Sequence, residues 1–206
     1  MKYTSILIFL FSALVGIKAQ DLKKGQWLKQ QFQALEDGDS LVIPSGKYTI
    51  RDGFYEIEAN NVHIIGQGLT EIVTLDPFEH VLIAHSQRLT LSNLHLRHEG
   101  QRLDYKCTEG VLRIENCKDC LIERCDINGC GIIGIQFGYF RKEHQRKIRV
   151  QNCHIHNNSN AAFGINYRDL EEHQIQAKEL EKKYGIYLQN NTIENNGKYR
   201  WFPQRL

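Results

Sequence analysis

Three residues of types that can bind metals, two histidines and an aspartate, recur at nearly regular intervals along the sequence. His95, Asp126 and His154 are separated by 31 and 28 residues. Two imidazoles with a carboxylate between them can hold a transition metal such as copper or zinc. The alternative is a ladder of polar surface side chains that hydrogen-bond to one another without a metal. Either arrangement requires a structural repeat that brings residues of this spacing side by side.

The sequence contains such a repeat. A six-residue pattern, apolar–polar–turn–apolar–polar–apolar, occurs at 91–96, 122–127, 150–155 and 188–193. Its alternation predicts two short strands separated by a tight turn, and periods of roughly 20 to 50 residues are typical of solenoids. Inward side chains are then expected to stack from coil to coil, with the metal-binding residues on the outside. The expected inward columns are Leu89/Cys120/Ile148/Ile186, Leu91/Ile122/Val150/Leu188, Leu94/Cys125/Cys153/Asn191 and Leu96/Ile127/Ile155/Ile193.

The turn positions of the repeat are occupied mainly by asparagine. They are Asn93, Arg124, Asn152 and Asn190. Asparagine tolerates left-handed backbone angles, and its amide can bond to the turn of the next coil. The segment 34–48, with its Gly-Asp and Pro-Ser-Gly turns, leads into the first strands.

These features resemble the pectate-lyase-like superfamily of right-handed parallel β-helices, where an asparagine ladder fills this turn. The resemblance extends to chondroitinase-like, alginate-lyase-like and NosD-like periplasmic proteins. It implies an all-β, right-handed parallel β-helix solenoid of about five coils with an N-terminal capping helix. We expect that capping helix over 22–35, where apolar residues line one side. A helical insert is expected at about 169–183.

Members of this superfamily that act on polysaccharides bind them outside the strands predicted here at 81–85, 111–114, 134–137 and 163–167. The resemblance therefore implies an acidic polysaccharide, or another glycan, as the partner. Arg113 would bind a uronate carboxylate or act as the base of a β-elimination, and calcium would be the cation of such a lyase. The residues expected to contact the substrate are His85, Glu115, Gln136, Tyr139, Asn166 and Arg168.

The sequence lacks the catalytic signatures of the lyases, polygalacturonases and pectin methylesterases at matching positions. Fold alone does not establish an activity. A non-enzymatic function is therefore the alternative hypothesis. It is a structural or NosD-like metal-handling protein that uses His95, Asp126 and His154 to hold copper or zinc.

The N-terminal segment and the net charge indicate where the protein is expected to act and which partners it is not expected to bind. Residues 1–19 have the positive start, apolar run and small terminal residue of a signal peptide. We therefore expect an exported protein, periplasmic or extracellular, with a single domain over 20–206 and no other bilayer span. The net charge of +2 gives no basic excess of the kind that indicates nucleic-acid binding. The oligomeric state is left open.

Six cysteines allow three interpretations. Cys120, Cys125 and Cys153 fall at inward positions, where cysteine acts as a small apolar side chain. A zinc cluster and a disulfide are the alternatives. The zinc cluster would use Cys117, Cys120, Cys125 and Cys130, and the disulfide would join Cys107 to Cys130 or Cys117.

Overall fold

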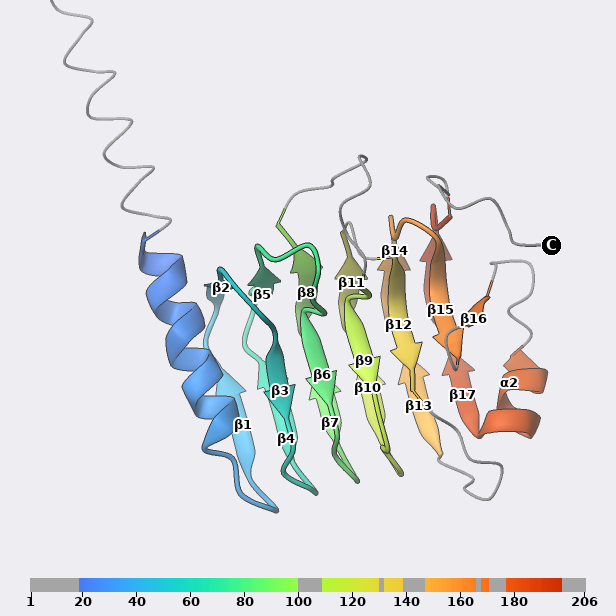
Figure 1. Cartoon of the computed structure of the whole chain (residues 1–206). Coiled ribbons are helices and arrows are strands. Elements are labelled where there is room, and N and C mark those ends of the chain that lie inside the picture. Colours follow the sequence, from blue (N-terminus) through green and yellow to red (C-terminus); the bar gives the residue numbers. More distant parts are fainter. Residues whose placement is uncertain are drawn as a thin grey trace, which may run out of the picture.

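The protein folds into three parallel sheets that wrap around one core (Figure 1). The computed structural model describes residues 19–99, 109–129, 132–138, 147–165, 168–170 and 177–197. Sheet A contains β1 (Ser40–Ile43), β4 (His63–Gly66), β7 (Thr90–Ser92), β10 (Leu121–Glu123), β13 (Ile148–Gln151) and β17 (Ile186–Gln189). Sheet B contains β2 (Gly46–Ile50), β5 (Thr70–Thr74), β8 (His95–His98), β11 (Asp126–Asn128), β14 (His154–His156) and β18 (Thr192–Glu194). Sheet C contains β3 (Tyr55–Ile57), β6 (Leu82–Ala84), β9 (Leu112–Ile114), β12 (Ile133–Phe137), β15 (Ala161–Ile165) and β16 (Arg168–Leu170).

The order of the strands defines a solenoid. The chain passes through sheets A, B and C in turn, and each strand pairs in parallel with its equivalent in the next coil. The exception among the described strands is β16, which returns antiparallel to β15. The expected all-β parallel solenoid is confirmed.

The predicted inward columns are confirmed by the register. Ile122 pairs with Leu91 on one side and with Val150 on the other, and Val150 pairs with Leu188. Ile127 is flanked in the same way in sheet B by Leu96 and Ile155. Members of these columns in β7 to β14 are fully buried, and they form part of one continuous apolar core.

The turn between sheets A and B has the expected left-handed backbone. The φ angles of Asn93, Arg124, Asn152 and Asn190 lie between 50° and 55°. Backbone bonds join successive turns, for example from Asn152 N to Gln189 O at 3.0 Å. This conformation explains the preference for asparagine, since other residues adopt it less readily.

The side-chain ladder that joins the coils lies one residue after this turn. Asn191 Nδ2 donates to Val150 O at 2.8 Å. In the preceding coils the same column carries thiols: Cys153 Sγ donates to Ile122 O at 3.5 Å, and Cys125 Sγ donates to Leu91 O at 3.7 Å. A buried cysteine therefore replaces the amide, with a weaker donor of smaller volume.

The cysteines that the structure describes are buried free thiols. The interpretation of Cys120, Cys125 and Cys153 as core residues is confirmed, and Cys117 is buried beside them. Cys107 and Cys130 lie outside the described residues, so the disulfide between them stays a prediction. Within the described ranges, Cys117, Cys120 and Cys125 form no group of potential metal ligands.

Helices lie at both ends of the solenoid (Figure 1). Residues 19–33 are helical, near the range expected for the cap, and bury Leu28 and Phe32. Phe32 packs edge-on against Tyr55, with ring centroids 5.8 Å apart. At the other end, α2 (Ala177–Tyr184) packs beside β17. This helix lies at the C-terminal end of the insert expected over 169–183, whose first two residues belong to β16 instead.

Neighbouring residues of β13 test whether the stacked columns determine stability. Ile148 is fully buried and pairs with Ile186, whereas Arg149 is exposed. Ile148→Ala should lower the free energy of unfolding by about 2–5 kcal/mol, because it leaves a cavity in the column. Arg149→Ala is the matched control and should change it by less than about 0.5 kcal/mol. Urea denaturation measures both, and equal losses would contradict the role assigned to the column.

Candidate functional site

The outer face of sheet B gathers polar side chains from successive coils. Asp126 of β11 pairs with His95 of β8 and with His154 of β14. Two residues further along the strand, Asn128 pairs with Arg97 and with His156. Because alternate residues of a strand point to the same face, these positions form two adjacent outward columns at the strand spacing of about 4.8 Å.

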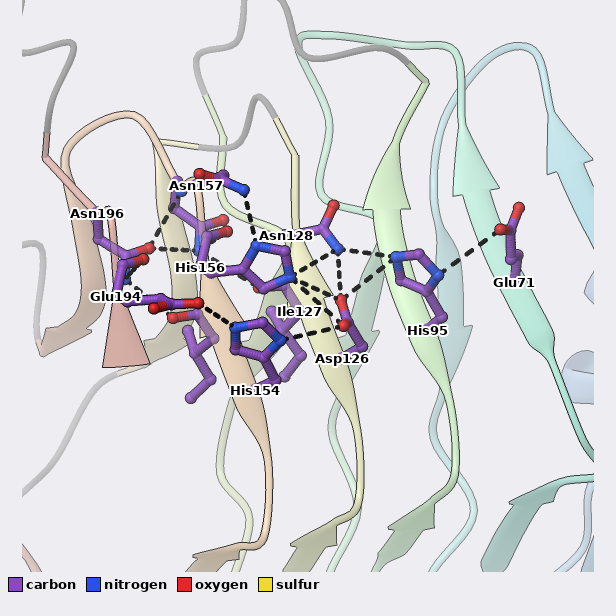
Figure 2. Close-up of polar contacts among 12 residues, drawn as sticks. Glu71, His95, Asp126, Ile127, Asn128, His154, His156, Asn157, Glu194 and Asn196 are labelled. Atoms are coloured by element: carbon purple, nitrogen blue, oxygen red, sulfur yellow. Dashed lines mark hydrogen bonds and ion pairs between the residues drawn. The ribbon is translucent and has the colours of Figure 1, made fainter. Parts of the chain in front are cut away.

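Imidazole nitrogens of three histidines surround the Asp126 carboxylate (Figure 2). His156 Nε2 lies 3.2 Å from Oδ1 and 3.4 Å from Oδ2. His154 Nδ1 lies 3.5 Å from Oδ2, and His95 Nε2 lies 3.3 Å from Oδ1. The carboxylate is therefore the common neighbour of side chains from three coils.

Asp126, His154 and His156 together form a potential metal-binding group. One ligand atom from each lies within 4.8 Å of the other two. The rings of His154 and His156 are stacked, with centroids 3.8 Å apart and an interplanar angle of 18°. The side chains are partly exposed, 39% for His154 and 16% for His156, so an ion can reach them from solvent.

The predicted ligands were His95, Asp126 and His154, and His156 was not among them. The structure places His95 beside Asp126 but outside the group of three. The pattern His154-Ile155-His156 contained the missing information, since residues i and i+2 of a strand share a face. The choice between His95 and His156 depended on side-chain geometry, which the spacing of the repeat does not specify.

The outer nitrogens of these histidines also have partners. His154 Nε2 lies 2.9 Å from Glu194 Oε1, and Asn157 Nδ2 lies 2.7 Å from His156 Nδ1. His95 Nδ1 lies 3.7 Å from Glu71 Oε1. Metal-binding histidines usually donate their other ring N–H to an acceptor such as a carboxylate, and Glu194 and Glu71 can accept in this way from His154 and His95. The Asn157 amide can do the same for His156 only through its oxygen, with the amide turned over.

Burial favours the neutral, ligand form of His95. Desolvation lowers the pKa of His95, against the opposing effects of the Asp126 and Glu71 carboxylates. A neutral imidazole carries the lone pair that a metal requires. The sheet B face thus combines a carboxylate with imidazoles oriented by their outer partners.

Sheet C carries the residues predicted to act on a polysaccharide. Arg113 lies in register between Ile83 and Gln136, and Gln136 is buried. Arg113 Nε donates to Glu115 Oε1 at 2.6 Å, and Nη2 donates to the same oxygen. Glu115 Oε2 in turn lies 3.5 Å from His85 Nδ1. A ligand carboxylate at Arg113 therefore has to compete with Glu115.

The other predicted contacts on this face are described in part or not at all. Tyr139 and Asn166 lie outside the described residues. The backbone of Arg168 pairs with Ile165 at the start of β16, and its side chain is outside the described part of the chain. The catalytic role of Arg113 and the substrate contacts of this set stay predictions.

His80 and Glu109 join the Arg113 network, which no pattern in the sequence indicated. His80 Nδ1 lies 3.0 Å from Gly110 O, and Nε2 lies 3.0 Å from Glu109 Oε2. Arg113 Nη1 approaches the same Nε2 at 3.5 Å. Burial, followed by the Arg113 charge, lowers the pKa of His80 to about 4, and desolvation raises the pKa of Glu109.

Comparison with known families agrees with the topology. The model of a family described as right handed beta helix region matches residues 48–199, well over half of the 206 residues. The chain belongs to this family, and the expected right-handed parallel β-helix is confirmed. Comparison with curated proteins and with solved structures found no significant match. Among the described residues, no helix has the length and apolarity needed to cross a bilayer.

His80 is expected to make stability depend on pH. Its pKa is about 4 in the folded protein, against an ordinary value of 6.5. Between these values the unfolded chain binds a proton that the folded protein does not, so stability falls as the pH falls from 6.5 towards 4. The contribution is about 3 kcal/mol.

Urea denaturation at pH 7.5 and pH 4.5 measures this loss. His80→Asn should lose less stability over the interval than the wild type, because asparagine does not titrate. His63→Asn replaces an exposed histidine of β4 and should keep the wild-type pH dependence. An unchanged pH dependence in His80→Asn would rule out His80 as its source.

Proposed function

We propose that this β-helix protein binds a transition-metal ion on the outer face of sheet B. The ligands are Asp126, His154 and His156. The observation that carries the proposal is their geometry: the two imidazole nitrogens lie 3.2–3.5 Å from the carboxylate oxygens, and one ligand atom from each residue lies within 4.8 Å of the others.

The donor atoms indicate the kind of metal. Zinc–nitrogen bonds of about 2.0–2.1 Å place tetrahedral donor atoms roughly 3.3 Å apart, close to the distances around Asp126. Imidazole and carboxylate together suit zinc, copper, nickel or iron. Calcium prefers six to eight oxygen ligands, so the two histidines make it a poor match for this group.

A metal-free polar ladder is the competing explanation. Each contact on the face can be drawn as a hydrogen bond between neighbouring coils. However, three histidine nitrogens converge on one carboxylate, and their outer nitrogens are already held by Glu71, Glu194 and Asn157. Such oriented convergence supports a cation site, because ordinary surface pairs contribute little stability and need no such order.

Titration of residues 20–206 with zinc or copper tests the proposal. We expect one ion per chain, measured by isothermal calorimetry and by metal analysis after gel filtration. Asp126→Ala and His156→Ala should each abolish stoichiometric binding, because each removes one of three ligands. His63→Ala removes an exposed histidine of sheet A and should bind like the wild type. Binding that persists in both ligand variants would rule out this site.

An acidic polysaccharide is a second candidate ligand, on the outer face of sheet C. Its support is the clustering of Arg113, Glu115 and His85; the predicted contact Gln136 is buried and gives no support. Glycan binding outside the cytoplasm would follow from the expected signal peptide at residues 1–19. Cleavage by β-elimination, with calcium at the uronate carboxylate, is the enzymatic form of this proposal.

A panel of uronate polysaccharides, with and without calcium, tests the second candidate. Lyase activity would appear as the ultraviolet absorbance of unsaturated products, and binding as retardation in affinity electrophoresis. Arg113→Ala should abolish either signal if Arg113 holds the carboxylate, whereas Arg149→Ala, an exposed arginine of sheet A, should not. Wild-type activity that survives in Arg113→Ala would exclude Arg113 from the site.

A further inference from the structure

We propose that Asn128 determines the coordination and affinity of the metal site by occupying the position between His95, Asp126 and His156. This inference rests on the proposed metal-binding function and extends it. The Asn128 amide keeps His95 from becoming a ligand. The site therefore binds its ion with three protein ligands instead of four.

The Asn128 amide nitrogen lies at the centre of the polar cluster (Figure 2). Nδ2 lies 2.8 Å from His95 Nε2 and 3.3 Å from His156 Nε2. It also donates to Asp126 Oδ1. Asn128 is 8% exposed, so its amide has little access to water and depends on these protein groups for its hydrogen bonds.

The Asn128 amide has fewer N–H hydrogens to donate than there are potential acceptor atoms around its nitrogen. An amide NH₂ has two hydrogens, whereas His95 Nε2, His156 Nε2 and Asp126 Oδ1 all face Nδ2. A cation at this position can interact with the carboxylate oxygen and with the lone pair of each Nε2 that carries no proton. The amide nitrogen therefore occupies a position whose neighbouring atoms are of the kind that coordinate a cation.

The position of the amide decides which histidines can reach one ion. His154 and the Oδ2 side of Asp126 lie away from Asn128, and His156 Nε2 is shared between the two sides. His95 contacts the Oδ1 side, where the amide lies. With Asn128 in place, an ion is held by Asp126, His154 and His156. If the amide is absent, the His95 imidazole can approach as a further ligand.

This arrangement fits a site that exchanges its ion. Three ligands leave a coordination position open to solvent, whereas closed four-ligand sites are typical of structural zinc. The amide also holds the imidazoles and the carboxylate in place before the ion arrives. Asn128 therefore orients the ligands and at the same time limits their number.

The experiment compares zinc binding by the wild type, Asn128→Ala and Asn128→Ser. Both variants should bind zinc more tightly, whereas loss of a partner that only orients the ligands would lower the affinity about ten- to a hundredfold. Gln151→Ala is the matched control: it removes another outward amide, which donates to Glu123 on sheet A, and should bind like the wild type. Asn128→Ser also removes the amide but keeps a polar side chain on the strand, and so tests the idea even if Asn128→Ala fails to fold.

A second readout separates coordination from general stability. In a protein labelled with ¹⁵N-histidine, zinc should shift the ring nitrogens of His154 and His156 in the wild type and leave those of His95 nearly unchanged. In Asn128→Ala it should also shift the His95 ring nitrogens. A merely structural role of Asn128 changes thermal unfolding without recruiting His95.

The outcomes distinguish this inference from the proposed function. If the wild type binds zinc, and both Asn128 variants bind with unchanged affinity and no His95 shift, the inference is overturned and the metal site stands. If the wild type binds none and a variant binds one ion through His95, the role of Asn128 stands and native metal binding is overturned. If no protein binds zinc, both are overturned.

Discussion

Parallel, in-register pairing of equivalent strands is the constraint on which the rest of the structure depends. Because each strand of a coil pairs with its counterpart in the next, a residue such as Ile122 meets Leu91 and Val150. Inward positions therefore have to be apolar in every coil, or carry a donor that reaches the neighbouring carbonyl. Cys125 and Cys153 satisfy the second condition with thiols, and Asn191 satisfies it with an amide.

The same constraint concentrates chemistry on the outside. Outward side chains from successive coils lie about one strand spacing apart, so their donor atoms can turn towards one another and converge on one metal ion. On sheet B this brings Asp126 between His95 and His154, with His156 one column away. The outer face of a sheet can thus assemble a site of several ligands from residues distant in sequence.

The outer face of sheet C has the same strand spacing but a different balance of charges. Arg113 is held by Glu115, and the neighbouring His80 is kept neutral by burial and by the guanidinium charge. The positive charge on this face is therefore largely balanced within the protein. On sheet B the imidazoles instead surround one carboxylate, which favours an added cation. This difference in charge balance favours the sheet B face for the proposed cation site.

The sequence by itself indicated the solenoid, because a short strand pattern repeated at intervals of 28 to 38 residues buries its apolar columns when the coils stack. It also placed the left-handed turns, such as that at Asn152, and the outward position of Asp126. Only the tertiary structure decided which side chains meet. The inclusion of His156 and the central position of Asn128 depend on rotamers and on register between coils, as does the contact of His80 with Glu109. His154 and His156 lie two residues apart on one strand, but the contacts of Asn128 with His95 and of His80 with Glu109 join residues about 30 positions apart and leave no local pattern in the sequence.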